Sequence, residues 1–233
     1  HKEATYQKSY GNRQLVPEIE KATKETIYDL ASLTKVVATT PAVMKLIEGG
    51  AIELDAPAQQ YLPELSGDSN KPKITVRHLL THTSGLAAGV RRGYEWSGSK
   101  DGFALAAGEP SRSLAGLSYQ YSDLNFILLG EIVARVTGMP LQDYCCKEIF
   151  LPLGMNQTFF LPDPKLEGRI APTTLLEDGS LLRGIVHDPT SRRMGGVAGH
   201  AGLFSTVDDL ARFARMLLNG GGGILKPETI SLM

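Results

Sequence analysis

Cysteine is scarce in this chain: the 233 residues contain only Cys145 and Cys146, which are adjacent. Adjacent cysteines pair only under strain, so a disulfide framework is excluded and the redox compartment stays open. Long apolar runs are also lacking. The richest stretch, residues 126–136, is interrupted by Glu131 and Arg135. It falls short of the roughly 18 residues that a membrane span requires, so we predict no membrane span.

An excess of charge of either sign is missing as well. The 24 Lys and Arg residues nearly balance the 25 Asp and Glu residues, and the formal net charge is −1. Without a basic surplus we predict no nucleic-acid partner. Hydrophobic residues make up 42% of the chain, which is enough for one large core. The chain begins with His1 rather than Met, so we expect the natural N-terminus to lie further upstream.

The most informative stretch that is present is Ser32-Leu33-Thr34-Lys35. Residues i and i+3 lie on the same face of a helix, so Lys35 can stand beside the Ser32 hydroxyl. Serine is a weak nucleophile by itself, and a neighbouring neutral amine can take its proton. Largely apolar flanks, residues 27–31 and 36–40, would bury the helix and disfavour the charged ammonium. Such a short motif also occurs by chance, so its meaning depends on the context.

Three further blocks follow in a fixed order: residues 76–86 (VRHLLTHTSGL), 121–130 (YSDLNFILLG) and 195–206 (GGVAGHAGLFST). Together with Ser32 to Lys35 they resemble the serine beta-lactamase-related family, which includes class C beta-lactamases, DD-peptidases and esterases of the same fold. The resemblance covers nearly the whole chain. It implies a mixed α/β (α+β) fold with an antiparallel sheet flanked by helices. We expect one domain over residues 1–233, with a helical subdomain at roughly 50–160.

The resemblance implies that Ser32, Lys35 and Tyr121 are catalytic, because a Tyr-x-Asn element of the family faces the serine and its tyrosine hydroxyl carries protons. Here the third position is Asp123 instead of asparagine. An ionised carboxylate accepts hydrogen bonds but cannot donate them. Asp123 could accept one from the Lys35 ammonium and stabilise its charge. That would weaken Lys35 as a free base and strengthen the case for Tyr121.

A competing interpretation uses Ser122-Asp123 as the start of the Ser-Asp-Asn element of class A beta-lactamases and penicillin-binding proteins. Leu124 separates Asp123 from Asn125, so that triplet is not intact. No convincing equivalent of the class A deacylating glutamate is visible either. The interpretation based on Tyr121 is therefore preferred, against the plainer alternative of a half-buried tyrosine that precedes a helix.

The family's third element, Lys-Thr-Gly or His-x-Gly, is matched in letters by His200-Ala201-Gly202. Its surroundings instead fit the family's glycine-rich segment, and Ser205 or Thr206 would cap the helix that follows. We therefore expect the third element and the second oxyanion donor to lie beyond Met233. The chain would then be a fragment truncated at both ends, with little activity alone, because an oxyanion donor is worth on the order of 10²–10³ in rate.

Other titratable residues give weaker signals. His78 and His82 have the spacing of helical zinc ligands, but Leu79 replaces the glutamate of that motif and no third ligand is evident, so we predict no metal and no cofactor. His187 and Asp188 are adjacent, which suits a catalytic pair poorly. The resemblance places them at the rim of the site.

The candidate substrate contacts are accordingly Asp123, His187 and His200. Four arginines either bind a substrate carboxylate bidentately or form a solvated face: Arg91, Arg92, Arg192 and Arg193.

Periodicity and turn residues predict the elements. We expect a strand over residues 4–10, helices over 32–48, 75–80, 124–136, 140–150 and 207–218, and an irregular excursion over 87–118. The predicted function is that of a serine hydrolase that forms an acyl-enzyme with a small-molecule acyl substrate. An ester and a beta-lactam rank level, and a D-alanyl peptide ranks below them. The alternative is a family member that binds penicillin or peptidoglycan without turnover, as a sensor or structural protein. Compartment (periplasm, cell exterior or cytoplasm) and oligomeric state stay open.

Overall fold

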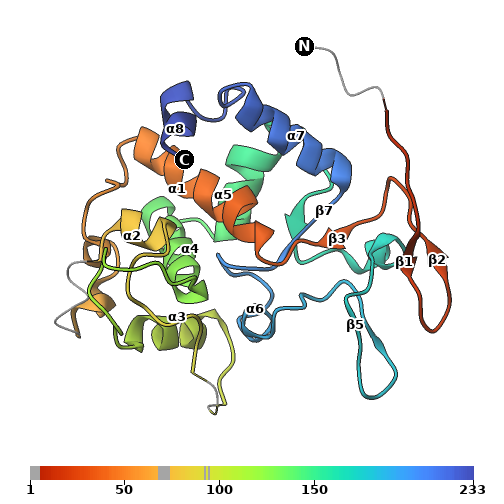
Figure 1. Cartoon of the computed structure of the whole chain (residues 1–233), viewed down its shortest axis with the longest axis horizontal. Helices are drawn as coiled ribbons and strands as arrows, with labels where there is room; N and C mark the ends of the chain where they lie inside the picture. The colour runs from red at the N-terminus through yellow and green to blue at the C-terminus, as the bar shows by residue number, and fades with distance from the viewer. Residues whose placement is uncertain (1–5, 68–73, 92, 94) are drawn as a thin grey trace.

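The computed structural model describes residues 6–67, 74–91, 93 and 95–233. Most helices gather on one side of the molecule, and small antiparallel sheets lie on the other (Figure 1). The α-helices are α1 (Thr40–Glu48), α2 (Val76–Leu80), α3 (Ser99–Gly108), α4 (Asp123–Thr137), α5 (Leu141–Cys145), α6 (Pro189–Arg193), α7 (Val207–Leu218) and α8 (Pro227–Leu232). Two π-helical segments adjoin them, η1 (Lys35–Thr39) before α1 and η5 (Cys146–Phe150) after α5. Within the described residues the 3₁₀ segments are η2 (Ala58–Gln60), η3 (Pro63–Gly67) and η6 (Pro164–Arg169).

The sheet that positions the candidate site has the strand order β3-β7-β4. The strands are β1 (Asn12–Gln14), β2 (Glu20–Lys21), β3 (Tyr28–Asp29), β4 (Phe159–Phe160), β5 (Thr174–Leu175), β6 (Leu181–Leu182) and β7 (Leu203–Ser205). Central β7 pairs antiparallel with both neighbours. Its pairing with β3 continues in a 2.9 Å bond from Leu30 N to the Leu203 carbonyl. The segment before β7 therefore runs beside the segment after β3, which brings two distant parts of the sequence together.

Helix α4 is the centre of the core. Nine of its residues are buried, and it packs against α1, α2, α3 and α5. Its ends follow from local chemistry: the Ser122 side chain accepts a hydrogen bond from Asn125 N, and Gly138 ends the helix with φ of 66°. Such a helix, apolar on most faces, is stable only when neighbours cover it.

Several expected elements are confirmed, together with the mixed α/β fold. The helix predicted over 75–80 is α2 with Thr75 as its cap, and Thr206 caps α7 as expected. The helices predicted over 124–136 and 140–150 are α4 and the pair α5–η5. The helix predicted over 32–48 starts later, as η1 followed by α1. The proposed helical subdomain stays a prediction.

Two expectations were wrong. Residues 6–10 form no strand, while residues 4 and 5 lie outside the described residues, and the first strand is β1. The alternation of side chains there does not suffice, because a strand needs a partner to bond with. The excursion over 87–118 contains α3, a helix that is stabilised by burying Phe103 and Ala106.

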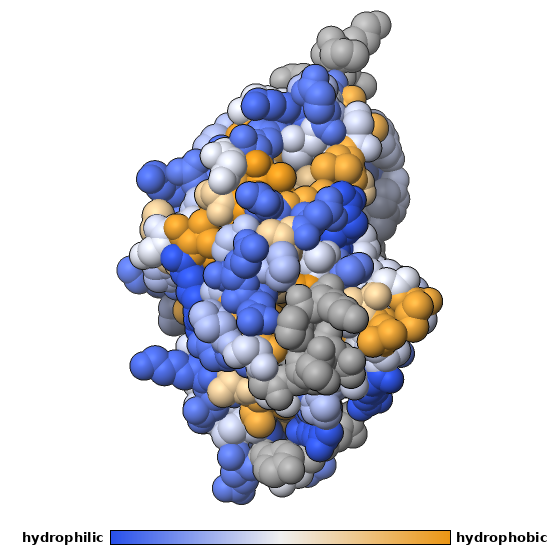
Figure 2. Space-filling view, turned by 90° about the vertical axis from the view of Figure 1, so that its left-hand side faces the viewer, coloured by the Kyte–Doolittle hydropathy of each residue, from blue (hydrophilic) through white to orange (hydrophobic). Residues whose placement is uncertain are grey.

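Figure 2 shows that the face at the left of Figure 1 is mainly polar, with its hydrophobic side chains in separate patches. Within the described part of the chain, no single helix is long and apolar enough to cross a membrane. One pair, α4 with the α5–η5 segment, meets the length and composition test only together, and it is bent by 76°.

Candidate active site

Ser32 lies on a sharp turn between β3 and η1 and is exposed. The turn depends on Ala31, whose φ of 45° is unusual for a residue with a side chain. Asp29 supports it, because its Oδ1 accepts a 2.8 Å hydrogen bond from Ala31 N. Strained backbone of this kind is concentrated at functional sites. Sequence reasoning gave no sign of it.

Lys35 is buried, with 3% of its side chain exposed, and it points at the serine. Its Nζ lies 3.0 Å from Ser32 Oγ, 3.0 Å from the His200 carbonyl oxygen and 2.8 Å from Asp123 Oδ1. Three acceptors match the three N–H bonds of an ammonium. The predicted contacts of Lys35 with Ser32 and with Asp123 are therefore both formed, and among the described residues Asp123 Oδ1 has no partner besides this ion pair.

Tyr121 reaches the same ammonium with its ring rather than its hydroxyl. The Lys35 Nζ lies 4.8 Å from the centre of the Tyr121 ring, within the range of a cation–π contact. Among the described residues the Tyr121 hydroxyl has no hydrogen-bond partner, and the residue is 40% exposed. The structure thus brings Tyr121 to the site, and its part in proton transfer stays a prediction.

Asp123 is positioned by the start of α4. Its backbone N donates a 2.7 Å hydrogen bond to the Ala88 carbonyl, and the preceding Ser122 hydroxyl donates to Ala87 at 2.6 Å. These bonds fasten the segment that carries Tyr121 and Asp123 to the segment after α2. The Ser122 hydroxyl caps α4 and donates to the Ala87 carbonyl. It is therefore not free to act as the serine of a Ser-Asp-Asn element.

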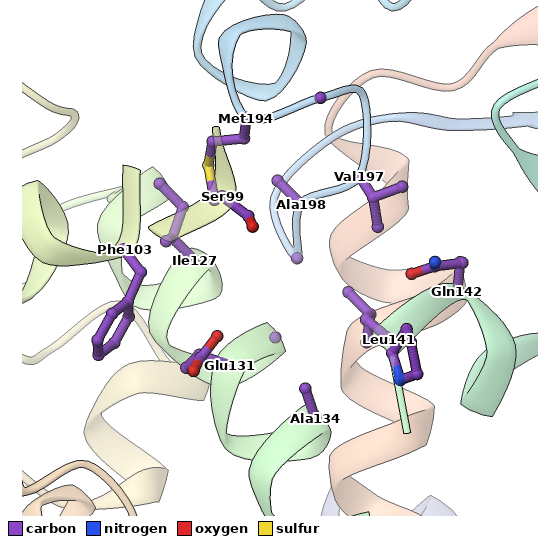
Figure 3. A pocket seen from close by; sticks show the side chains of 14 residues that line it. Ser99, Phe103, Ile127, Glu131, Ala134, Leu141, Gln142, Met194, Val197 and Ala198 are labelled. Carbon is purple, nitrogen blue, oxygen red and sulfur yellow. The ribbon is translucent and has the colours of Figure 1, made fainter. Parts of the chain in front are cut away.

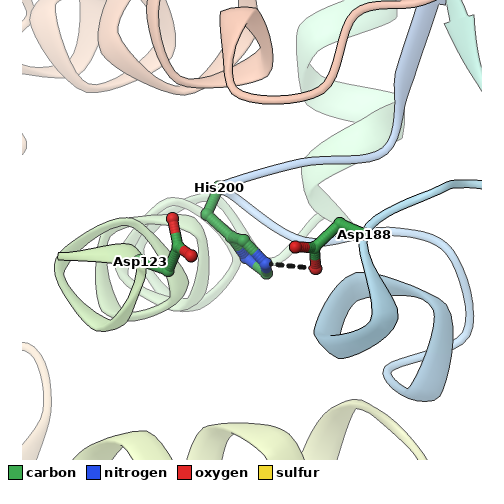
Figure 4. A group of neighbouring side chains, drawn as sticks. All are labelled: Asp123, Asp188 and His200. Carbon is green, nitrogen blue, oxygen red and sulfur yellow. Dashed lines mark hydrogen bonds and ion pairs between the residues drawn. The ribbon is translucent and has the colours of Figure 1, made fainter. Parts of the chain in front are cut away.

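Asp188 pairs with His200 and not with its neighbour His187. The His200 ring lies between Asp123 and Asp188 in Figure 4, and its Nε2 is 2.9 Å from Asp188 Oδ1. Burial opposes ionisation of Asp188, but the His200 hydrogen bond and charge hold the pKa of Asp188 below its ordinary value. His187 is exposed, and its backbone N donates to Asp29. No contact of the His187 ring with the serine or lysine is formed among the described residues.

Asp123, Asp188 and His200 each offer one ligand atom, and these atoms lie within 4.8 Å of one another. That spacing could suit a metal ion. However, the buried Lys35 ammonium already occupies the Asp123 carboxylate and would repel a cation at close range. We therefore assign these three residues to the surroundings of Lys35 and not to a metal centre.

A close approach of two glycines sets the position of the His200 carbonyl. A Cβ on Gly199 would lie 2.0 Å from the Phe126 carbonyl oxygen, and one on Gly130 would lie 3.1 Å from Gly199 Cα. The Thr39 hydroxyl holds the Gly199 carbonyl at 2.7 Å. Sequence reasoning missed this packing, although the glycine-rich block at 195–202 was the signal that could have found it.

The other singled-out histidines have local roles. His78 Nδ1 accepts from Thr75 N at 3.2 Å, which completes the cap of α2. His82 Nδ1 accepts from Ser122 N at 3.0 Å. The Nδ1 atom of each histidine thus accepts a hydrogen bond from a backbone N–H, which fits the structural interpretation of the pair.

The arginines do not converge on the serine. Arg91 pairs with the buried Glu109 at 2.9 Å, Arg193 lies 5.8 Å from the Trp96 ring centre, and Arg192 donates to a backbone carbonyl. Arg92 lies outside the described residues. A substrate contact by any of the four stays untested.

A separate cavity of about 290 Å³ lies between α3, α4 and the segment 194–199 (Figure 3). Its floor is apolar, with Phe103, Ile127 and Leu141, and Glu131 stands at its side. Ser32 and Lys35 do not line it, so the cavity is distinct from the Ser–Lys pair.

Solved structures that are similar to this chain define the class of its fold. The octameric penicillin-binding protein homologue from Pyrococcus abyssi aligns over 91% of this chain and 49% of its own, with a TM-score of 0.73 and 29% identity. EstCE1, described as a hydrolase with promiscuous acyltransferase activity, aligns over 92% of this chain and 64% of its own, with a TM-score of 0.74 and 25% identity. The fold is that of penicillin-binding proteins and their relatives.

The family model described as Beta-lactamase matches residues 1–233. The chain belongs to the Beta-lactamase family. A curated relative from Salmonella schwarzengrund, named "Putative D-alanyl-D-alanine carboxypeptidase", is 34% identical over 93% of this chain and 56% of its own length. The chain thus spans about half the length of the curated relatives that it matches.

Proposed function

We propose that this chain carries the nucleophile of a serine hydrolase that works through an acyl-enzyme. The observation that carries the proposal is the 3.0 Å approach of the buried Lys35 Nζ to the exposed Ser32 Oγ. A hydroxyl beside a shielded amine, open to substrate on its other side, is the arrangement that nucleophilic catalysis requires. Membership of the Beta-lactamase family supports the same chemistry.

The proton path follows from the contacts of Lys35. Three acceptors surround Lys35 Nζ, and as an ammonium it would have to pass one proton on before it could accept another. Asp123, at 2.8 Å, is the nearest carboxylate that could take it. The neutral amine would then take the Ser32 proton as Oγ bonds to the substrate carbonyl carbon. The same proton can later be returned to the leaving group.

The oxyanion that forms in this step needs donors. The Ser32 backbone N–H has no hydrogen-bond partner among the described residues, and it stands at the start of a helical segment. A free N–H at that position can stabilise the negative oxygen of a tetrahedral intermediate. A second donor would complete the pair.

The substrate class is the finer part of the proposal. Ester, beta-lactam and D-alanyl peptide all present a carbonyl to the same serine. The carboxypeptidase name of the curated relatives favours a D-alanyl peptide, while the description of EstCE1 as a hydrolase with promiscuous acyltransferase activity fits a broader range of acyl donors. We propose an acyl substrate of one of these three kinds.

One observation favours a second candidate, a protein that is acylated and then released slowly. The ion pair of Lys35 with Asp123 stabilises the ammonium, which cannot act as a base toward the deacylating water. Such a protein would bind penicillin or peptidoglycan without efficient turnover.

A fluorophosphonate probe and a fluorescent penicillin test the proposal and separate the two candidates. We expect labelling of the wild-type chain and none of Ser32→Ala. Ser180→Ala is the matched control, because Ser180 is an exposed serine that donates to Asp178 at 2.6 Å but has no lysine partner. Rapid loss of the penicillin label indicates a hydrolase, and persistent label together with no hydrolysis of an ester or a D-alanyl peptide indicates the binding protein. Labelling that survives Ser32→Ala contradicts both.

A further inference from the structure

We propose that His82 is a positioning residue that holds Tyr121 and Asp123 against Lys35, and that it does so only while its imidazole is neutral. This inference rests on the proposed function, because it concerns the geometry of the same site. His82 is not among the residues that the Ser–Lys chemistry uses directly. It lies on the turn after α2 and is buried, with 9% exposed.

His82 holds the tyrosine segment at two points. Its carbonyl accepts a 2.8 Å bond from Gln120 N, and its ring Nδ1 accepts a 3.0 Å bond from Ser122 N. The two donors flank Tyr121 on either side. The segment that enters the site is therefore fixed immediately before and after the residue proposed to carry protons.

The His82 ring also packs against the residues that surround the ammonium. Its centre lies 4.5 Å from that of Tyr121 with a tilt of 31°, and 5.2 Å from that of Phe126. Lys35 Nζ lies 4.8 Å from the Tyr121 ring centre and 5.8 Å from that of Phe126. The imidazole and the ammonium thus share two aromatic neighbours, and a displacement of His82 would move the rings that shield Lys35.

The hydrogen bonds decide the state of the ring. Nδ1 accepts from Ser122 N–H, so it carries no proton, and the neutral ring bears its hydrogen on Nε2. Asn125 Nδ2 also faces Nδ1 at 3.5 Å, and its amide orientation is set by Ser84, whose hydroxyl donates to Asn125 Oδ1 at 2.6 Å. A proton on Nδ1 would face two donors and break the bond to Ser122.

The surroundings of His82 also favour its neutral form on balance. The titratable groups that face it are Lys35 from η1, Asp123 from α4, and the phenols of Tyr119 and Tyr121. Burial and the Lys35 charge lower the pKa of His82 below its ordinary value, although Asp123 opposes them. As the pH falls, His82 gains a proton, releases Ser122 and allows the Tyr121 segment to leave Lys35. The site should therefore lose reactivity on the acid side.

Two substitutions separate this role from mere packing. In His82→Asn the amide Oδ1 takes the place of Nδ1 as an acceptor that does not titrate. Asparagine also tolerates the φ of 57° at this position. In His82→Leu the apolar volume remains but the acceptor is lost. His78→Asn is the control, since His78 is a nearby histidine with no contact to the Tyr121 segment among the described residues.

The readout is the pH dependence of Ser32 labelling by a fluorophosphonate at saturating probe. We expect His82→Leu to label about tenfold more slowly or worse, because a buried N–H loses its acceptor. We expect the labelling rate of His82→Asn to stay within about threefold of the wild-type rate at neutral pH. We also expect the fall of its rate on the acid side of the pH profile, the acid limb, to move to lower pH. His78→Asn should keep the wild-type limb. A nitrogen-15 NMR spectrum should show His82 Nδ1 unprotonated at neutral pH.

An unchanged acid limb in His82→Asn would overturn the inference, and so would a protonated Nδ1 at neutral pH. Wild-type labelling by His82→Leu would also overturn it. If His82→Leu does not fold, the acid limb of the pH profile of His82→Asn and the NMR spectrum still test the inference. Absence of labelling in the wild-type chain would instead refute the proposed function, while the NMR result would still test the hydrogen bond of His82.

Discussion

Gly199→Ala is the substitution that tests most sharply how the fold supports the Ser–Lys pair. The new Cβ would lie 2.0 Å from the Phe126 carbonyl oxygen and 3.1 Å from Gly130 N. Both are backbone atoms of α4, so neither can turn aside as a side chain would. The segment 195–202 must move away from the helix, and the His200 carbonyl that binds Lys35 moves with it.

The expected cost follows from these contacts. Overpacking of a well-packed region typically costs about 1–3 kcal/mol. Loss of one hydrogen bond to a charged group adds roughly 1.5–3 kcal/mol if Lys35 finds no other acceptor. If both costs apply, the free energy of unfolding should fall by about 2.5–6 kcal/mol, a large part of the stability of an ordinary domain.

Urea denaturation gives the change in stability, and the rate of Ser32 labelling by a fluorophosphonate gives the effect on the site. Gly108→Ala is the matched control, because a Cβ there meets no atom within 4 Å and the backbone φ is not positive. The control should be neutral or slightly stabilising. If Gly199→Ala is as stable as wild type and labels at the same rate, the packing argument is wrong.

Three further predictions concern the surroundings of Lys35. Asp123→Asn removes the charge partner of the buried Lys35 and the carboxylate that would take its proton, so we expect lower stability by urea denaturation together with slower labelling of Ser32 by a fluorophosphonate; an unchanged labelling rate would contradict the proton path. Thr34→Val removes a buried hydroxyl that accepts a 3.1 Å bond from a β7 backbone N–H, so stability should fall by about 1–3 kcal/mol, whereas equal urea midpoints would show that the bond contributes little. Asp188 has a pKa below its ordinary value in the folded state, so its contribution is present above that ordinary value and is lost as the pH falls through the lowered one. Asp188→Asn should therefore flatten the loss of stability below about pH 4, and a wild-type pH profile in that variant would exclude the pairing with His200 as its cause.

Features that depend on residues close together in the sequence were predicted correctly. Features that depend on how separate segments pack against each other were missed. The contact of Lys35 with Ser32 follows from their spacing of three residues, and the caps of α2 and α7 follow from single hydroxyl residues. The pairing of Asp188 with His200 was not predicted, because it depends on where a loop folds back twelve residues later.

Two other features could not be predicted from the sequence pattern. Helix α3 carries Gly102 in its interior, which weakens the preference of its sequence for helix, and it packs against α4. The positive φ of Ala31 is imposed by the neighbouring sheet and η1, and an alanine gives no hint of it. Local preference was overridden in both places by tertiary structure.

Mass spectrometry of the intact chain after reaction with a fluorophosphonate, with mapping of the modified peptide, tests the central claim most directly. A single slow turnover suffices, because the adduct accumulates even when turnover is poor. We predict one adduct per chain, on Ser32, and a rate at least 100-fold lower in Lys35→Met, on the order expected when a catalytic base is removed. An adduct at another residue, no adduct, or an equal rate in Lys35→Met would contradict the account.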